Sequence, residues 1–115
     1  MRYLFIYRPG EDSDARPTPK QIEEMGAFIG DMFKTGKLIA TDGLMASKHG
    51  AKVSIDNGNI SVVDGPFTET KEIIGGYAIM NMNSKEEAIE EAKKFLKFMG
   101  KGSSEVRRMG DPPQA

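Results

Sequence analysis

Charged side chains crowd the segment 64–77, DGPFTETKEIIGGY. Asp64 stands beside Gly65-Pro66, which ends a strand because glycine adopts unusual backbone angles and proline has no amide hydrogen to donate. Two carboxylates here could serve as general acid and general base if a cleft raised the pKa of one, and a lysine would neutralise a neighbouring acid. The alternative is a connection between strands whose charges face water. The charged residues that follow Asp64 are Glu69, Lys71 and Glu72.

Other residues with chemical potential are few. His49, the one histidine, could transfer protons near neutral pH, although a solvent-exposed side chain is the simpler interpretation of its loop position. Asp64 and His49 are therefore the catalytic candidates, and no reaction follows from them. The tyrosines could line a pocket and donate hydroxyl hydrogens, or they could pack an interface. The predicted ligand-binding set combines them with the loop: Tyr3, Tyr7, Asp64, Phe67, Glu69, Lys71, Glu72 and Tyr77.

Composition excludes several classes of function. With 115 residues, no cysteine and one histidine, the chain offers no disulfide, no thiolate chemistry and no zinc site. The loop acids lack the spacing of a calcium loop, and no phosphate loop or serine-nucleophile motif is present, so we expect no metal and no cofactor. A net charge of −1 argues against a nucleic-acid partner. The apolar N-terminal run is too short for a signal peptide or a membrane span, and we expect a cytoplasmic protein without a membrane partner.

Helical periodicity predicts two α-helices. Each begins with a capping box, formed by Thr18 with Gln21 and by Ser84 with Glu87. The apolar stripes are Ile22, Met25, Ile29, Met32 and Phe33 in the first helix, and Ala88, Ile89, Ala92, Phe95, Leu96 and Met99 in the second. The second helix is expected to turn its acids and lysines to water: Glu86, Glu87, Glu90, Glu91, Lys93, Lys94 and Lys97.

Segments rich in β-branched and aromatic residues predict strands over 3–7, 37–41, 52–56, 59–63, 77–82 and 105–109. Asn57-Gly58 predicts a two-residue hairpin turn, because such a turn needs positive backbone angles. In the resulting register Ile55 faces Ile60, Val53 faces Val62, and the pair Ser54 and Ser61 lies on the other face. Asp42-Gly43 is interpreted as a plain turn, and residues 111–115 as a frayed tail.

This order of elements predicts one domain over residues 1–115, a two-layer α+β sandwich with a mostly antiparallel sheet and two helices on one face. We expect the helices to cover the face that carries Leu4, Ile6 and the hairpin aliphatics. The opposite face, with Tyr3, Phe5 and Tyr7, would then be exposed. An exposed apolar face of that size is usually an interface, so we predict a symmetric homodimer.

The motif DGPFTETKE of residues 64–72, followed by Gly75-Gly76-Tyr77, resembles the signature of the DGPF-domain proteins of the YCII-related family. The resemblance extends over nearly the whole chain. Other segments that share it are 3–7, Gly43-Leu44, the hairpin, 84–88 and 105–107. It implies a single YCII-related (DGPF) domain with a ferredoxin-like fold that forms a dimeric α+β barrel.

For function, the resemblance implies two possibilities. YCII-like relatives are proposed to be enzymes because a histidine and an aspartate meet in the barrel cleft. Here the first helix has no histidine, and Met25 lies about where that histidine would fall. The histidine–aspartate pair is therefore not assigned to this chain. One hypothesis is therefore a small-molecule-binding protein, or a weak acid–base enzyme, with a cleft between the sheet and the loop 64–72. The other is a non-catalytic regulatory or interaction module, since some DGPF proteins are associated with sigma factors of the extracytoplasmic-function type.

Overall fold

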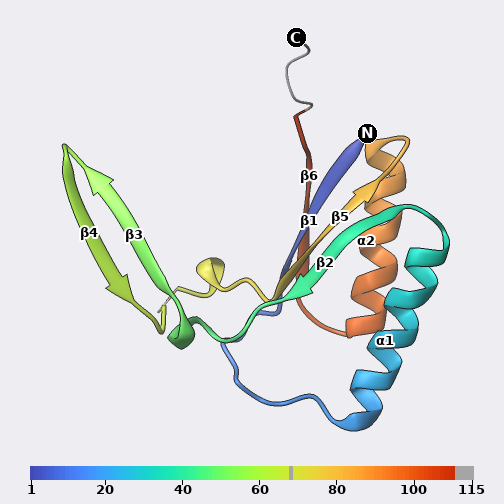
Figure 1. Ribbon diagram of the computed structural model, residues 1–115, viewed down its shortest axis with the longest axis horizontal. Coiled ribbons are helices and arrows are strands. Elements are labelled where there is room, and N and C mark those ends of the chain that lie inside the picture. Colours follow the sequence, from blue (N-terminus) through green and yellow to red (C-terminus); the bar gives the residue numbers. More distant parts are fainter. Residues whose placement is uncertain (68, 111–115) are drawn as a thin grey trace.

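The computed structural model describes residues 1–67 and 69–110, so the predicted tail 111–115 lies outside the described residues. The main elements follow the predicted order (Figure 1). They are β1 (Arg2–Arg8), α1 (Pro19–Lys34), β2 (Leu38–Gly43), β3 (Ala51–Asp56), β4 (Asn59–Asp64), β5 (Gly76–Asn81), α2 (Lys85–Met99) and β6 (Ser103–Arg108), with short 3-10 turns η1 (Ser47–His49) and η2 (Thr70–Glu72).

Four strands form an antiparallel sheet in the order β2-β5-β1-β6. The two central strands are β1 and β5, and α1 and α2 lie on the same side of the sheet (Figure 1). This is the ferredoxin-like α+β arrangement, with a separate hairpin inserted between β2 and β5. The predicted fold class is therefore confirmed.

The two faces of the sheet are the reverse of our expectation. Tyr3, Phe5 and Tyr7 are buried under the helices, with only 4% of Tyr3 exposed, whereas Leu4 and Ile6 are half-exposed on the other face. Alternation along β1 divides its residues into two sets but does not say which set faces the helices. The aromatic rings fit under the helices because α2 presents small residues, Ala88 and Ala92, to the sheet. These alanines pack in the core with Tyr3, Phe5, Leu38, Met80 and Met82.

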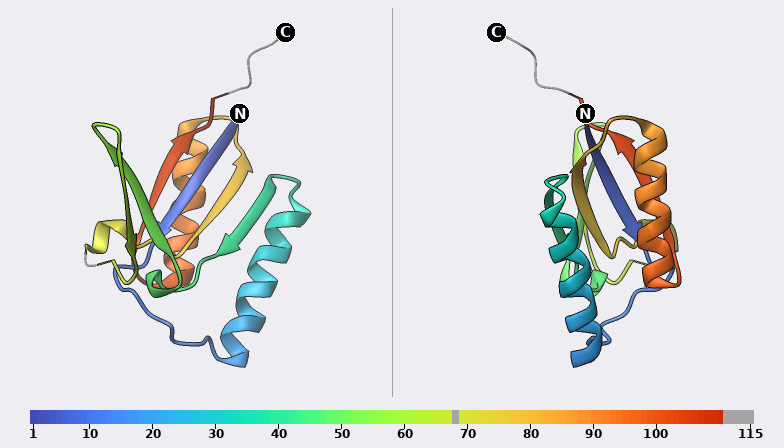
Figure 2. Two further views of the ribbon diagram at one scale, coloured as in Figure 1. Left: turned by 60° about the vertical axis from the view of Figure 1, so that its left-hand side comes forward. Right: turned by 90° about the vertical axis from the view of Figure 1, so that its right-hand side faces the viewer.

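The hairpin keeps its predicted register, with Val53 opposite Val62, Ile55 opposite Ile60 and Ser54 opposite Ser61. Asn57 and Gly58 take the positive φ values, 49° and 81°, that the turn requires. However, β3 and β4 form their own two-stranded sheet, and every one of their residues is exposed. We call this hairpin, residues 51–64, the arm. The prediction that the helices cover it was wrong, because it projects away from the body of the protein (Figure 1; Figure 2).

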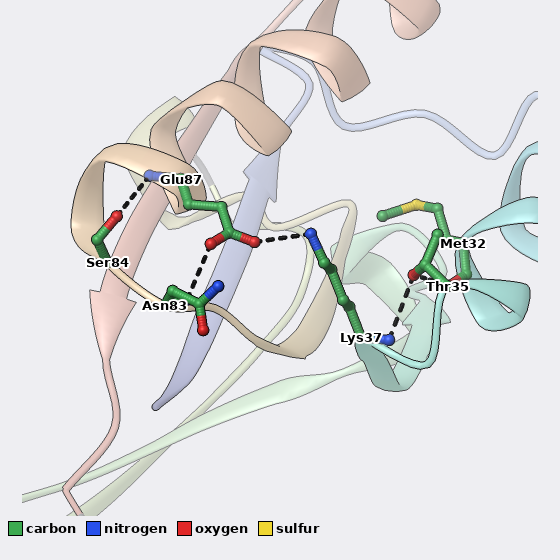
Figure 3. Close-up of polar contacts among 6 residues, drawn as sticks. All are labelled: Met32, Thr35, Lys37, Asn83, Ser84 and Glu87. Carbon is green, nitrogen blue, oxygen red and sulfur yellow. Dashed lines mark hydrogen bonds and ion pairs between the residues drawn. The ribbon is translucent and has the colours of Figure 1, made fainter.

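A polar cluster ties the end of α1 to the start of α2 (Figure 3). Lys37, just after α1, forms an ion pair with Glu87 at 2.8 Å. Glu87 also accepts a hydrogen bond from the amide of Asn83 at 3.0 Å, and its own amide donates to the Ser84 hydroxyl at 3.1 Å. The hydrogen bonds and the Lys37 ammonium lower the pKa of the Glu87 carboxyl, with the ammonium as the largest cause. The cluster therefore fixes the spacing of the two helices at this end.

Candidate functional site

A cavity of about 350 Å³ lies between the helices and the sheet. We call it the helix cavity. It exists because α1 stands off the sheet: none of its residues is fully buried. Of the predicted apolar stripe, Met25, Ile29 and Met32 line the cavity, whereas Ile22 and Phe33 are exposed. Phe28 stacks on Phe98, with ring centroids 4.6 Å apart, and lies 6.0 Å from Phe95. These rings and the Lys37–Glu87 ion pair hold α1 against α2 and leave space beneath it.

The lining of the helix cavity is mostly apolar. Its walls are Met25, Phe28, Ile29 and Met32 from α1 and Glu91, Phe95 and Met99 from α2; its floor includes Phe5, Tyr7, Leu38, Thr41, Ala78 and Met80. Backbone is also exposed to it at Gly43, Gly75 and Gly76. A Cβ on Gly76 would lie 2.8 Å from the carbonyl oxygen of Asp42, so only glycine fits there. Glycine at this position therefore lets the β2 and β5 backbones approach closely at the edge of the cavity.

Three hydroxyl groups at the helix cavity, those of Tyr7, Thr41 and Tyr77, are already hydrogen-bonded. Tyr7 donates to the carbonyl oxygen of Lys101 at 2.9 Å, and burial raises the pKa of its phenol. Thr41 donates to the Tyr77 carbonyl at 2.8 Å. The Tyr77 hydroxyl donates to the Asp42 carboxylate at 3.1 Å, and this bond raises the pKa of Tyr77. Both phenols therefore stay protonated at neutral pH and cannot act as bases there.

A second cavity, of about 410 Å³, lies at the foot of the arm. We call it the arm cavity. The chain between β2 and β3 forms one side, and the loop after the arm forms the other: its lining is Leu44, Met45, Ala46, Ser47, His49, Gly50, Ala51, Phe67, Glu72, Ile73 and Ile74. The Phe67 amide donates to the Ser47 hydroxyl at 2.8 Å, and the Gly65 amide donates to the Gly50 carbonyl at 3.0 Å. These bonds anchor the root of the arm.

His49, at the edge of the arm cavity, has an acidic partner that the sequence did not reveal. Its Nε2 lies 3.2 Å from the Asp14 carboxylate, which also binds Lys48 at 2.6 Å. The bond from Lys48 is the largest cause that lowers the pKa of Asp14. The His49 side chain is 43% exposed, so the expected exposure is confirmed, but the residue is paired. A carboxylate that orients an imidazole beside an apolar cavity can support proton transfer.

The structure distributes the predicted ligand-binding residues over several places. Tyr7 and Tyr77 lie at the helix cavity, Phe67 and Glu72 at the arm cavity, and Tyr3 in the core. Asp64, Glu69 and Lys71 are exposed and line neither cavity. Within the described residues of the loop, Glu69 binds Lys71 at 3.1 Å, the expected neutralisation, and Glu72 binds Lys52 at 2.6 Å. The roles of Asp64, Glu69 and Lys71 in ligand binding stay predictions.

Two residues that line the helix cavity were not among the predicted ligand-binding residues. Asp42, interpreted as part of a plain turn, lies opposite Tyr77 in the sheet and bonds to it. Glu91, expected on the water side of α2, is half-buried and lines the helix cavity. Helical spacing could have predicted the inward position of Glu91, because this residue lies three positions after Ala88 and four before Phe95, which both face inward. In residues 1–67 and 69–110, no group of three histidines or acids could hold a metal ion.

Comparison with known proteins places the chain in a family. Among solved structures, 5-chloro-2-hydroxyhydroquinone dehydrochlorinase from Burkholderia phenoliruptrix AC1100, in complex with 2,5-dihydroxybenzoquinone, is similar over 97% of this chain and 96% of its own, with 16% identity and a TM-score of 0.49. No curated protein matches the chain. No helix in the described part of the chain is long and apolar enough to cross a membrane. Residues 1–109 match the YCII-related domain. The chain therefore belongs to the YCII-related family.

Proposed function

We propose that this protein binds a small, largely apolar molecule in the helix cavity and works as a homodimer. The observation that carries the proposal is the cavity itself, about 350 Å³ in volume, under a helix that buries none of its own residues. Its volume is at the lower end of the range of ligand pockets, which are mostly apolar with a few placed polar groups. An apolar space left unfilled forfeits packing energy, so a ligand that fills it would stabilise the protein.

Binding rather than catalysis is proposed for the helix cavity, because its two phenols already donate hydrogen bonds within the protein and stay protonated at neutral pH. Acid–base activity, if the protein has any, is better supported at the arm cavity. There His49 and Asp14 form the oriented pair that proton transfer needs. The loop 64–72, which includes the predicted ligand-binding residue Phe67, forms part of that cavity.

A cavity-filling variant tests the helix cavity. Met32→Trp places a larger side chain in the wall, whereas Phe33→Trp makes a similar change at the next position, which is exposed and outside the lining. A metabolite library is screened by thermal shift against wild type. A ligand present at a hundred times its Kd should stabilise wild type and Phe33→Trp by about 2.7 kcal/mol and leave Met32→Trp unchanged. Equal stabilisation of both variants would show that the ligand binds elsewhere.

A third variant tests the loop separately. Asp64→Ala leaves the helix cavity intact, so hits that bind there should be retained. Hits that Asp64→Ala loses, and Met32→Trp keeps, would instead place the ligand at the loop 64–72.

The proposed homodimer rests on two apolar surfaces that the protomer leaves uncovered. On the face of the sheet away from the helices, Leu4, Ile6 and Ile79 are half-exposed. On one face of the arm, the aliphatic side chains are between 63% and 70% exposed: Val53, Ile55, Ile60 and Val62. Exposed apolar patches of this kind usually mark interfaces. In a dimer with two-fold symmetry, the arm of each copy would contact its partner, and both copies would make the same contacts.

The second candidate function, a non-catalytic interaction module, is favoured by the same arm if it docks on a different protein. The two candidates differ in solution behaviour. A protein that is monomeric by sedimentation, and that no compound stabilises through the helix cavity, would fit the interaction module.

A further inference from the structure

The charged side chains that line the helix cavity all have one sign. Its charged lining residues are Asp42 and Glu91, and none of the described lysines, arginines or histidines lines it. Asp42 already accepts a hydrogen bond from Tyr77. Glu91 makes no hydrogen bond or ion pair within residues 1–67 and 69–110. The nearby ammonium of Lys37 is bonded to Glu87 at 2.8 Å and lies outside the lining.

The position of Glu91 on α2 sets it apart from the other acids of that helix. Ala88, Ala92, Phe95 and Met99 recur at helical spacing and face the body of the protein. Glu91 falls within this apolar stripe and is half-buried, whereas its neighbour Glu90 is exposed and binds Lys93 at 3.0 Å. The Lys37 ammonium is near enough to interact with Glu91 electrostatically, but no group within residues 1–67 and 69–110 donates a hydrogen bond to this carboxylate. A half-buried carboxylate on a mostly apolar wall therefore loses hydration without gaining a hydrogen bond in return.

From this we infer that the ligand of the helix cavity is an apolar amine, whose protonated amino group binds the Glu91 carboxylate. The inference rests on the function proposed above and names the chemical class of the ligand. An ammonium would give Glu91 a charge-assisted hydrogen bond. The rings of Tyr7, Phe28 and Phe95 would contact the apolar body, and their faces attract a cation.

Carboxylates and phosphates are excluded by the same lining. An anion in the cavity would lose its hydration and face two carboxylates, with no basic group of the lining to compensate. Selectivity between an amine and an acid of the same shape therefore follows from charge alone. A neutral alcohol of that shape would gain the apolar contacts and could donate one hydrogen bond to Glu91, but it would lack the charge attraction that an ammonium adds.

The test uses three probes with one skeleton: phenylbutylamine, phenylbutanol and phenylbutanoate, titrated at neutral pH. Binding is measured by calorimetry and located by NMR shifts of the Gly76 and Ala78 amides, which lie in the cavity floor. The amine should bind most tightly and the acid least. Glu91→Gln should weaken amine binding by about tenfold or more and weaken alcohol binding much less, because it removes the negative charge but keeps an oxygen that accepts a hydrogen bond. The matched control is Glu90→Gln, which changes an exposed acid one position away.

Each contrary result has a distinct meaning. If the acid binds as tightly as the amine, or if both variants weaken the amine equally, the amine inference is overturned while small-molecule binding stands. If the alcohol binds as well as the amine, Glu91 has no ligand-selecting role and the inference is again overturned. If none of the probes shifts the cavity amides, both the inference and binding in the helix cavity are contradicted.

Discussion

Replacing Ile55 and Ile60 with serine should convert the proposed homodimer into monomers. The two side chains face each other across the hairpin, on the aliphatic side of the arm, and are 69% and 70% exposed in the protomer. The polar hydroxyl of serine would remain hydrated at these positions, and the double change would remove two of the four exposed aliphatic side chains on this face of the arm.

The size of the effect follows from the exposed area. Fully burying an isoleucine is worth about 1.5–3 kcal/mol, so burying the two-thirds that is exposed is worth about 1–2 kcal/mol. Each arm loses two such side chains, and a dimer has two arms, which gives about 4–8 kcal/mol. Since about 1.4 kcal/mol is a factor of ten, the dimer Kd should rise at least about a thousandfold. The protomer itself should lose little stability, because surface substitutions usually change it by about 0.5 kcal/mol or less.

Sedimentation equilibrium measures the Kd, and thermal denaturation checks that the fold is kept. The control is Val63→Ser, which removes a 55%-exposed aliphatic side chain from the opposite face of the same hairpin. A double variant that dimerises with wild-type affinity would refute the role of the arm. A wild-type protein that stays monomeric at every accessible concentration would refute the dimer itself.

Two further predictions concern stability. The folded-state pKa of Glu87 lies below its usual value of 4.5, mainly through its bond to Lys37. The stability that this carboxylate contributes is therefore fully present above about pH 4.5 and is lost as the pH falls through the lower folded value. The melting temperature should drop between pH 7 and pH 3, and it should drop less in Glu87→Gln. Gly65→Ala would place a Cβ 1.7 Å from the Ser47 carbonyl oxygen and should cost about 1–3 kcal/mol by thermal denaturation, whereas Gly26→Ala, in open space on α1, should stabilise by about 0.5–1 kcal/mol. A wild-type melting temperature for Gly65→Ala would contradict the close contact at the root of the arm.

Local signals were enough to predict the elements and their order. The capping box of Thr18 with Gln21, the Asn57-Gly58 turn and the alternation of β1 each depend on residues close in sequence, and each is present as predicted. Which face of the sheet packs against the helices depends instead on which side chains the helices can accommodate. Nothing in β1 alone shows that small residues on α2, Ala88 and Ala92, leave room for tyrosine and phenylalanine rings.

The hairpin shows the limit of the same reasoning. A two-residue turn fixes the pairing of its own strands, and that pairing is correct to the residue. It carries no information on how the hairpin is attached, which depends on contacts at its root, such as the hydrogen bond from Gly65 to Gly50. Its aliphatic face was therefore assigned to the core, although in the protomer it faces outward.

The candidate sites were only partly predictable because each depends on pairs brought together from distant segments. His49 was identified by its type, yet its partner Asp14 lies in a loop that carries no motif, and only the folded chain sets them 3.2 Å apart. Asp42 and Tyr77 meet in the same way, through the register of β2 and β5. Glu91 differs from these, because its place in the α2 stripe could be counted from the sequence, and an acid at an inward position is unfavourable unless something binds it. The test of function therefore uses Glu91, because it is a half-buried carboxylate of the cavity lining that receives no hydrogen bond from the described residues.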